Sequence, residues 1–542
     1  MNLLIFLLYS FLQKCLSTST YDLTVVWERV TTDAMANSRH REPDEYIALM
    51  DPDGSFSDLM YGSDGSNSFM EHGRRLSNLG YNNMNGVPDM EDPIVRGLSY
   101  ITYDAPPNTD GNWWGHVIGT PNDLWKAIVL ARDVIDHQLM TDFLNRWWVE
   151  TPVGPVWNIE SHEGDMTGGN LAPRAMLAEV EALLRDNFDV IHEQVKEAMY
   201  RELAQREAYN DAGLRGDGCL HQHSIQPHST EVGYLDHILH LPYNHNYGKE
   251  LLRFSATLLF WHSGLETDFE EVTIEGLYSA YLECNQWLFR GHIGEPSNAG
   301  RKIDKGEIIM GAAAETSIWD VGNTLLEMGR HQDQIEAALH RYENAQPEEE
   351  FALNGNRFFY QSDLMVQHRR KYMASLRILS NRTCRPETWP DDDMNANGYF
   401  QADGWLSVLI YGSEFGTKKN HIFQVYDWAK VPGVTNLYTT DIPQFKRGPI
   451  HAEHFFNNEV FVGGVSNGMV GLATMPYQRY HLPLHANKTW FFFDDVIIAL
   501  GSGITLWESH QTGESVITTI SQINFSEGYY TMGYHNGTQK VR

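Results

Sequence analysis

The chain has 542 residues, 42% of them hydrophobic, and its 40 Lys and Arg against 71 Asp and Glu leave a formal net charge of -31. This length exceeds one ordinary domain and predicts two or three, and this charge argues against a nucleic-acid partner, which needs a basic surface. Net charge sets solubility and long-range steering rather than the field inside a cleft, so a groove for any polyanion would have to be locally basic.

The first 20 residues predict a secretory signal peptide. Residues 2–12 read NLLIFLLYSFL, a run too short to span a bilayer comfortably, and small residues follow up to Thr20. We expect this segment to be cleaved and the product to be secreted. No second long apolar stretch occurs, so we expect no stable membrane span. Four Asn-X-Ser/Thr triplets fit a secreted glycoprotein, at Asn381, Asn487, Asn524 and Asn536.

Three cysteines remain beyond the predicted signal peptide: Cys219, Cys284 and Cys384. An odd number cannot be paired completely within one chain. The sequence therefore does not predict a scaffold built from disulfides. It leaves open one bridge or a set of buried thiols.

Residues 21–345 are predicted to be mainly helical. Apolar residues recur at three- and four-residue spacing in several segments, namely 123–140, 172–199, 249–264, 273–289 and 311–344. Gly, Pro and Asn separate these segments. Serial amphipathic helix pairs of this kind favour an α/α toroid or solenoid, although no repeat of fixed length is visible.

Residues 346–542 are predicted to form a β domain. Near residues 345–348 the pattern changes to a polar, acidic run that resembles a linker. Short runs rich in aromatic and β-branched residues follow, bounded by turn residues, at 356–367, 372–380, 398–412, 459–475, 489–504 and 514–523. The chain is therefore predicted to be an α+β multidomain protein with a C-terminal antiparallel sandwich. Because it stops soon after the last run, we expect that sandwich to be incomplete.

Between residues 170 and 301 the chain presents an amide, an imidazole, a phenol and a guanidinium, each in a distinctive local sequence. They are Asn170 of TGGN, His223 of DGCLHQH, Tyr234 of STEVGY and Arg301 of NAGRKIDKG. An amide can hydrogen-bond to a uronate carboxylate as charge develops on it. A neutral His or ionised Tyr can then remove the C5 proton, and a Tyr hydroxyl can protonate the departing oxygen. An Arg can orient the acidic sugar, and no metal, cofactor or covalent nucleophile is required.

A pair of tryptophans lies upstream of these groups. Trp113 and Trp114 stand in NWWGHVIGTP. The apolar face of a pyranose stacks on aromatic rings, so the pair is predicted to hold a sugar chain. Burial of both rings in a core is the ordinary alternative.

Each of the four chemical residues also has an ordinary structural explanation. Asn170 precedes a helical run and could be its N-cap. His221 and His223 could both bind a metal, although no nearby carboxylate or Cys completes a familiar spacing. Tyr234 could be a core residue and Arg301 a surface charge. The functional hypothesis therefore depends on the combination.

Taken together, these motifs resemble polysaccharide lyase family 8, which includes hyaluronate, chondroitin and xanthan lyases. NWWGHVIGTP is similar to the family's tryptophan patch, DMTGGN to its TGAN motif, DGCLHQH to DGSFIQH and GRKIDKG to GRxISR. Four longer stretches are similar to its central sandwich: 395–405, 426–435, 461–475 and 487–504. The resemblance runs from about residue 112 to the end of the chain.

This resemblance implies roles for particular residues. Asn170 would neutralise the substrate carboxylate, and the catalytic His would be His223 rather than His221. Arg301 would match the first arginine of GRxISR. The resemblance also implies an N-terminal α/α toroid, a central antiparallel β-sandwich, and β-elimination that leaves a 4,5-unsaturated uronic acid. A smaller C-terminal domain of the family is expected to be missing.

The chain departs from the family pattern at three places. The family's tyrosine falls nine residues after the His and precedes Gly; that position is Val232 here, and a two-residue insertion would give the role to Tyr234. Lys305 replaces the second arginine and loses its bidentate geometry. The family has an acidic residue near the start of the segment that reads NANGYF here, whereas this chain has Met394, Asn395 and Asn397 there. Lys305, Asn395 and Asn397 are predicted to contact the substrate.

The sequence therefore predicts a secreted, monomeric carbon–oxygen lyase that acts on hyaluronan or chondroitin-type chains. Two alternatives stay open. The first is a carbohydrate-binding relative without activity, which Val232 motivates. The second is a glycoside hydrolase, because α/α toroids also carry inverting hydrolases with paired carboxylates.

Overall fold

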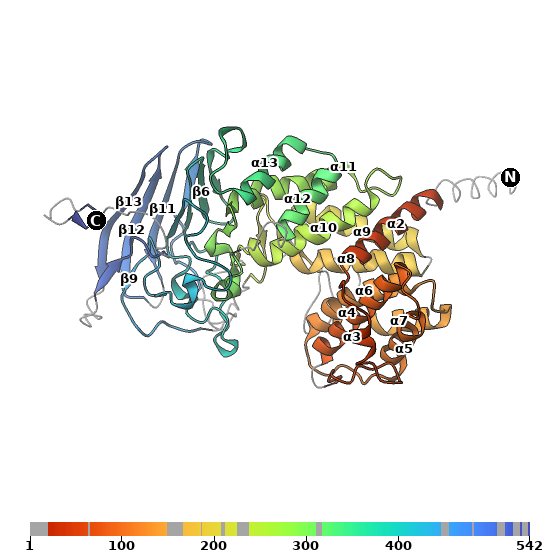
Figure 1. The fold of residues 1–542 in the computed structure, drawn as a ribbon. Coiled ribbons are helices and arrows are strands. Elements are labelled where there is room, and N and C mark those ends of the chain that lie inside the picture. The colour runs from red at the N-terminus through yellow and green to blue at the C-terminus, as the bar shows by residue number, and fades with distance from the viewer. Residues whose placement is uncertain are drawn as a thin grey trace, which may run out of the picture. The chain divides into compact units, whose positions relative to one another are not determined.

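The computed structural model describes residues 20–541 apart from 63–64, 149–165, 186, 207–211, 225–237, 310–316, 446–454, 480–481, 507–514, 524–531 and 534–539. The chain divides into two compact units (Figure 1). The first unit comprises residues up to 209 together with 250–277, and the second comprises 210–249 together with 278–542. Four predicted features lie outside the described residues: positions 1–19 of the signal peptide, Tyr234, and the sequons at Asn524 and Asn536.

The first unit is helical, as the apolar spacing predicts. Its helices are α2 (Thr20–Ala36), α3 (Asp44–Ile47), α4 (Gly65–Met84), α5 (Glu91–Ser99), α6 (Thr120–Ala131), α7 (His137–Trp147), α8 (Gly168–Leu184), α9 (Phe188–Tyr200), α10 (Lys249–His262) and most of α11 (Glu271–Ser279). Helix α6 packs against both α2 and α4, and α8 packs against α9. None of the described helices is long and apolar enough to cross a membrane.

The second unit combines two helices with antiparallel sheets. Its helices are α12 (Ser317–Glu327) and α13 (Gln332–Glu343). One four-stranded sheet has the order β5 (Gly355–Phe359), β6 (Leu364–Arg369), β7 (Tyr372–Arg377) and β8 (Trp405–Leu409). The other has the order β10 (Gly463–Ser466), β11 (Gly471–Gln478), β12 (Leu484–Phe492) and β13 (Ile497–Leu506). Two-stranded pairs complete it: β1 (Gly213–Leu214) with β2 (Leu220–His221), β3 (Phe289–Arg290) with β4 (Ile293–Gly294), β9 (Thr435–Leu437) with β14 (Val516–Thr518), and β15 (Met532–Gly533) with β16 (Lys540–Val541).

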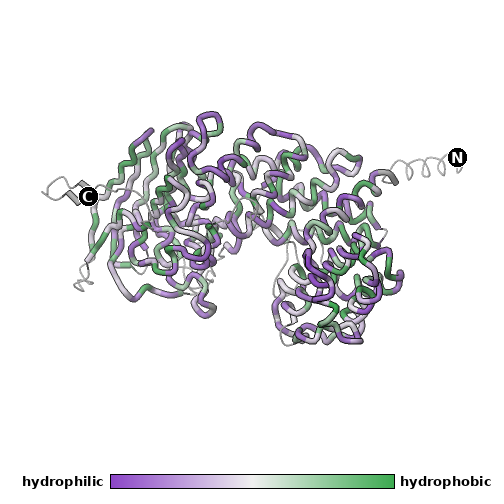
Figure 2. The backbone as a smooth tube through the Cα atoms, viewed as in Figure 1, coloured by the Kyte–Doolittle hydropathy of each residue, from purple (hydrophilic) through white to green (hydrophobic). Residues whose placement is uncertain are grey.

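The two four-stranded sheets share one hydrophobic core, so the predicted sandwich is confirmed. Along β12 the side chains of Leu484, Ala486, Trp490 and Phe492 alternate toward the interior, as the two-residue period of a strand requires. They pack in one cluster with residues of β6, β7 and β11, including Met365, Leu376 and Met475. Figure 2 shows hydrophobic stretches along these strands.

The change from helices to strands falls between the end of α13 at Glu343 and the start of β5 at Gly355. The compact units divide at other points. Residues 210–249 and the chain from 278 onward belong with the sheets, although helices occur among them. The segment that carries His223 is therefore part of the second unit.

One disulfide joins Cys219 and Cys284, which are 65 residues apart, and both residues are buried. The sequence left open either one bridge or a set of buried thiols, and the structure has the one bridge. Cys384 is a buried thiol whose Sγ donates to the carbonyl oxygen of Leu239 at 3.6 Å. The bridge anchors the DGCLHQH segment directly upstream of His223.

We expect that replacing Cys219 and Cys284 together by Ala will lower the free energy of unfolding by about 4 kcal/mol. A covalent link that closes a loop of 65 residues restricts the unfolded chain by about this amount. Denaturant unfolding under non-reducing conditions measures the change. The matched control is Cys384→Ala, for which we expect about 1 kcal/mol; equal losses for both variants would contradict a stabilising bridge.

Candidate active site

His223 stands at the end of a short, well-anchored segment of the second unit. Strand β2 ends at His221 and pairs with β1. The disulfide at Cys219 holds the residue directly before this strand. His223 itself has φ 55, a left-handed backbone conformation that is uncommon for a residue other than Gly. Such conformations collect at functional sites, where the surroundings enforce them. Its side chain is 22% exposed, so one edge of the imidazole reaches the surface.

The chain returns beside β2 and brings two tyrosines next to His223. The amide of Tyr243 donates to the carbonyl oxygen of Leu220 at 2.9 Å, which places the returning segment alongside the strand. Tyr243 and Tyr247 lie with ring centroids 6.2 and 4.8 Å from that of His223. Tyr247 is half-buried and belongs to a π-helical turn that ends at Gly248, directly before α10.

Arg301 enters the same cluster from a 3-10 turn, residues 300–305. Its backbone amide donates to the Tyr243 hydroxyl at 3.0 Å, and its Nη2 donates to the Tyr247 hydroxyl at 3.4 Å. This close approach requires glycine at position 300, because a Cβ there would overlap the ring of Tyr243 and because φ is +60. The glycine of the GR pair in this motif thus has a steric cause.

Glu387 is the acidic group of the cluster, and its carboxylate is completely buried. Its hydrogen bonds include those from Arg301 Nη1 at 2.9 Å, His223 Nδ1 at 3.1 Å, the Tyr243 hydroxyl at 3.3 Å and Trp389 Nε1 at 2.6 Å. The sequence prediction placed the absent acid near Met394 and did not consider Glu387. The structure corrects this, because a loop between β7 and β8 brings Glu387 to His223 from 164 residues away.

The carboxylate determines the state of the two basic groups. Because Glu387 can only accept, the proton of a neutral His223 is held on Nδ1, which leaves Nε2 as a proton acceptor. Burial by itself would lower the pKa of Arg301, but the charge of Glu387 and the hydroxyls of Tyr247 and Tyr243 together outweigh it and raise that pKa above its ordinary value. The cluster thus places an imidazole nitrogen that can accept a proton beside a fixed positive charge, an arrangement suited to an anionic substrate.

The two tyrosines differ in what they can do. Tyr243 is fully buried, and its hydroxyl is used by Arg301 and Glu387. Burial, together with the nearby charge of Glu387, raises the pKa of Tyr243 well above its ordinary value, so this phenol keeps its proton. Tyr247 is half-buried, and its hydroxyl faces the guanidinium of Arg301. Tyr247 is therefore the phenol that a substrate can reach.

Tyr247 also carries a signal that the sequence reasoning missed. The family's tyrosine precedes Gly, and Tyr247 is followed by Gly248 and then by the amphipathic helix α10. An insertion longer than two residues after His223 would give this alignment. Tyr234, the predicted catalytic tyrosine, lies outside the described residues.

Three predicted substrate contacts lie around this cluster. Lys305 is exposed and donates to the carbonyl oxygen of Asp393 at 3.1 Å. Asn397 is exposed and accepts from Gln444 at 3.1 Å. Asn395 is only 2% exposed, and its amide is bonded to Gln401 and to the backbone oxygen of Glu387. We therefore reassign Asn395 from substrate contact to support of the Glu387 loop.

Asn170 belongs to the first unit, on the first turn of α8. The N-cap of this helix is Thr167, so the N-cap explanation of Asn170 is wrong. The helix start is held by Glu202, which accepts from the amide of Gly168 at 3.1 Å. Among the described residues Asn170 Oδ1 has no hydrogen-bond partner although it is buried. This unpartnered atom is an acceptor, whereas the predicted role needs the amide N–H of Asn170 to donate to a carboxylate.

The two tryptophans of the first unit have different surroundings. Trp113 packs against a hydrophobic cluster that contains Val117, Ile118 and Leu171, the residue that follows Asn170. Trp114 is 41% exposed. Trp114 therefore presents a ring to solvent, whereas Trp113 is partly a core residue that supports the start of α8.

The two histidines that the sequence offered as metal ligands, His221 and His223, have different surroundings in the structure. His221 is fully buried, and its Nε2 faces the hydroxyl of Ser362 at 2.9 Å. Burial lowers the pKa of His221 well below its ordinary value. Among the described residues, one group of His, Cys and carboxylate side chains is close enough to hold a metal ion, and it contains neither His221 nor His223.

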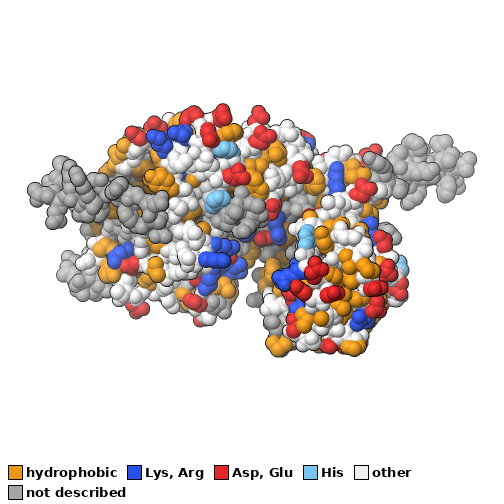
Figure 3. Space-filling view, viewed as in Figure 1, with side chains coloured by type: hydrophobic (Ala, Val, Ile, Leu, Met, Phe, Trp, Pro, Cys, Tyr) orange, Lys and Arg blue, Asp and Glu red, His pale blue; other side chains and the backbone are white. Residues whose placement is uncertain are grey.

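Charge is unevenly distributed over the surface. Figure 3 shows a group of Lys and Arg side chains gathered on the lower part of the second unit, while Asp and Glu side chains are spread over other parts of this face. Local basic surface can thus coexist with a net charge of -31.

We expect Glu387→Gln to lower kcat by about 10²-fold with little change in KM. The amide oxygen can still accept from His223 Nδ1, but the charge that supports a protonated imidazole is lost. Steady-state cleavage assays separate kcat from KM, and Glu387→Asp should recover part of the activity. A matched control is Glu283→Gln, an exposed carboxylate that pairs with Arg357; equal effects of both substitutions would contradict a positioning role.

Comparisons with known proteins place the chain in a family. Residues 81–318 match the N terminal alpha-helical domain of polysaccharide lyase family 8, and residues 354–542 match the super-sandwich domain of the same family. The chain is 24% identical to chondroitinase-AC of Pedobacter heparinus over 92% of its own length and 66% of that protein. It is 24% identical to a hyaluronate lyase of Thermasporomyces composti over 82% of its own length and 56% of that protein. The chain thus spans about half to two thirds of these relatives.

Solved structures show the same fold. A chondroitinase AC lyase structure superimposes with a TM-score of 0.76 at 20% identity, over 96% of this chain and 71% of that one. A chondroitin AC lyase of Streptomyces coelicolor in complex with chondroitin sulphate gives a TM-score of 0.68 at 18% identity, over 93% and 69%. Both matched domains occur here in the order that the resemblance implied, with a helical region before the sandwich. The chain therefore belongs to polysaccharide lyase family 8.

Proposed function

We propose that the protein cleaves uronic-acid polysaccharides of the hyaluronan or chondroitin type by β-elimination. The observation that carries this proposal is the cluster of His223, Tyr247, Arg301 and Glu387. In it His223 and Arg301 both bond to the Glu387 carboxylate, and Arg301 also donates to the Tyr247 hydroxyl. The named activities of the relatives, a chondroitinase and a hyaluronate lyase, support this substrate class.

The reaction needs one proton to leave carbon and one to reach oxygen. In the proposed mechanism His223 Nε2 takes the proton from C5 of the uronate. The electron pair forms the C4–C5 double bond, the C4–O bond breaks, and the Tyr247 hydroxyl protonates the departing oxygen. The rings of His223 and Tyr247 are 4.8 Å apart, so a proton can return from the imidazolium to the phenolate after each turnover.

Arg301 supplies the electrostatic part of the mechanism at this cluster. Its guanidinium, 3.4 Å from the Tyr247 hydroxyl, stabilises the phenolate while it lasts and attracts the acidic sugar. For the first unit we propose separately that the amide N–H of Asn170 donates to a uronate carboxylate and that the exposed ring of Trp114 stacks on a sugar ring.

The direct test is the ultraviolet spectrum of the products. Purified protein is incubated with hyaluronan, chondroitin sulfates, alginate and xanthan, and the absorbance of the conjugated double bond is followed. We expect it to rise with hyaluronan or a chondroitin. Bond cleavage without this absorbance would indicate hydrolysis, and binding without cleavage would indicate a relative that only binds carbohydrate.

The site itself argues against hydrolysis. An inverting hydrolase needs two carboxyl groups that reach substrate and water. Within the described part of the His223 cluster the carboxylate that contacts His223 and Arg301 is Glu387, which is completely buried and accepts hydrogen bonds from both residues. It is not available as a general acid.

We also propose that the protein is secreted and glycosylated. The apolar leader, the disulfide between Cys219 and Cys284, and an exposed sequon at Asn487 on β12 support an oxidising compartment. The sequon residue Asn381 is half-buried. Mass spectrometry of the protein from culture medium, before and after glycosidase treatment, tests both points; an intact leader or no mass change would contradict them.

A further inference from the structure

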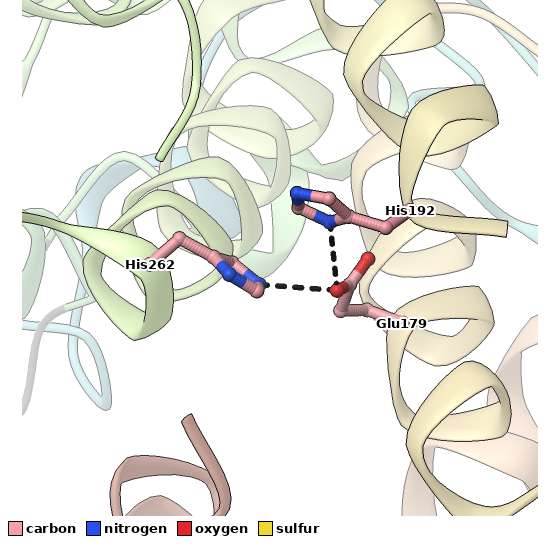
Figure 4. Close-up of side chains that lie close together, drawn as sticks. All are labelled: Glu179, His192 and His262. Carbon is pink, nitrogen blue, oxygen red and sulfur yellow. Dashed lines mark hydrogen bonds and ion pairs between the residues drawn. The ribbon is translucent and has the colours of Figure 1, made fainter. Parts of the chain in front are cut away.

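Three ionisable side chains meet in the interior of the first unit, and none of them is among the residues proposed for catalysis. Glu179 comes from α8, His192 from α9 and His262 from the last position of α10 (Figure 4). Glu179 Oε1 lies 2.9 Å from His192 Nδ1 and 3.1 Å from His262 Nε2. The three donor atoms all lie within 4.8 Å of one another, and the side chains of Glu179 and His262 are 0% exposed.

One residue orients both imidazoles. His192 Nε2 lies 2.8 Å from the backbone carbonyl oxygen of Thr267, and His262 Nδ1 lies 3.0 Å from its hydroxyl. Each ring can thus donate its outer N–H to Thr267 and direct the lone pair of its inner nitrogen toward Glu179. This is how metal-bound histidines are usually held, with the second ring nitrogen fixed by a carbonyl or another oxygen.

The carboxylate of Glu179 has an unused oxygen. Oε2 is buried and has no hydrogen-bond partner among the described residues. In the same part of the chain no Lys or Arg lies within ion-pair distance of Glu179; its ion-pair partners are the two imidazoles. A buried carboxylate needs a compensating positive charge and partners for both oxygens. A cation bound between the three side chains would supply both.

We propose that Glu179, His192 and His262 form a structural site for a divalent transition metal, with Zn²⁺ as the expected ion. Two nitrogen ligands and one carboxylate suit zinc, whose tetrahedral site can be completed by the second oxygen of Glu179 or by a water. Ligand atoms on such an ion lie about 3.3 Å apart, so an outward shift of a few tenths of an ångström accommodates it.

The site would link three helices and take no part in the polysaccharide chemistry. Aromatic rings close it, with Phe188 stacked on His192 at 4.7 Å and Phe269 edge-on to both imidazoles at 5.8 and 5.7 Å. Substrate cannot reach a site enclosed in this way, and the ion would be acquired during folding. Metal removal should therefore lower the stability of the chain. The lyase activity is tested separately, by the absorbance of the reaction products.

The experiment measures metal content and metal-dependent stability of the full chain. After chelator treatment and gel filtration, Zn²⁺ is added back, free ion is removed, and bound zinc is counted by plasma mass spectrometry. We expect about one zinc per chain. With free Zn²⁺ at 100 times its Kd the unfolding constant should fall about 100-fold, which appears as a rise in Tm.

Variants separate this site from adventitious zinc binding. His262→Gln and Glu179→Gln should lose the bound ion, and Thr267→Val should weaken affinity about 10- to 100-fold. His72→Gln is the matched control, because His72 is also fully buried in the first unit but bonds to Tyr61 and Gly97. Its zinc content should equal that of the wild type. Loss of zinc in the control, or its retention in both ligand variants, would overturn the proposal.

A measurement on the wild type covers the case in which ligand variants fail to fold. X-ray absorption at the zinc edge should show two imidazoles and oxygen in the first shell. A shell of sulfur, or of oxygen alone, would overturn the assignment. So would wild-type protein that neither retains zinc nor gains stability from it, in which case the three side chains share protons instead.

Discussion

Replacing Tyr247 by Phe is expected to lower kcat for polysaccharide cleavage by about 10³-fold with little change in KM. The substitution removes the proton donor for the departing oxygen and leaves the aromatic ring beside His223. Arg301 loses one hydrogen-bond acceptor but keeps its ion pair with Glu387 at 2.9 Å. Because binding contacts are retained, the loss should fall on the chemical step.

Two further tyrosine variants give this prediction its controls. Tyr243→Phe removes a buried hydroxyl that bridges Arg301 and Glu387, so we expect a stability loss of about 1–3 kcal/mol and a smaller effect on kcat. Tyr234→Phe tests the assignment made from spacing. If Tyr234→Phe abolishes activity while Tyr247→Phe keeps it, the catalytic phenol is Tyr234, as first predicted.

Replacing His223 by Ala is expected to lower kcat by at least about 10³-fold, because the proton acceptor for C5 is lost. The fold should persist, since His223 is partly exposed and stands outside the hydrophobic cores. Product absorbance under saturating substrate measures the activity, and a thermal melt verifies folding. Activity within a few-fold of the wild type would remove His223 from the mechanism.

A double variant tests whether the imidazole and the phenol act as one unit. If His223 and Tyr247 pass protons in the same turnover, the double substitution should cost little more than either single one. If the fold-loss in kcat of the double variant equals the product of the two single losses, the two residues act in independent steps. His221→Gln is not an informative control, because His221 is fully buried against Ser362 and its loss should act on stability.

The sequence predicted the fold correctly because the pattern that each element needs is local. Apolar residues at three- and four-residue spacing marked the segments that became α6, α8, α9 and α10. A run rich in aromatic and β-branched residues that begins at 489 marked part of β12, whose inward side chains contribute to the core of the sandwich. The identities of His223 and Arg301 were likewise available from short motifs, and the structure places them in one cluster.

The remaining parts of the site depended on where the chain returns in space. Spacing along the chain pointed to Tyr234, because an insertion of unknown length cannot be located by counting residues. The structure shows Tyr247 beside His223 instead, since a hydrogen bond from the Tyr243 amide to the Leu220 carbonyl oxygen sets that approach. Glu387 had no recognisable motif, and Asn395 proved to be a buried support for its loop.

By itself, then, the chain's residue pattern determined a helical region followed by an antiparallel sandwich and identified the imidazole and guanidinium of the cluster. Those features follow from periodicity and from side chains close together in the sequence. Only the tertiary structure decided which phenol and which carboxylate join them. It also decided that Glu179 meets His192 and His262. Such partners are brought together by packing between segments far apart along the chain, and the local sequence does not indicate which of these segments come into contact.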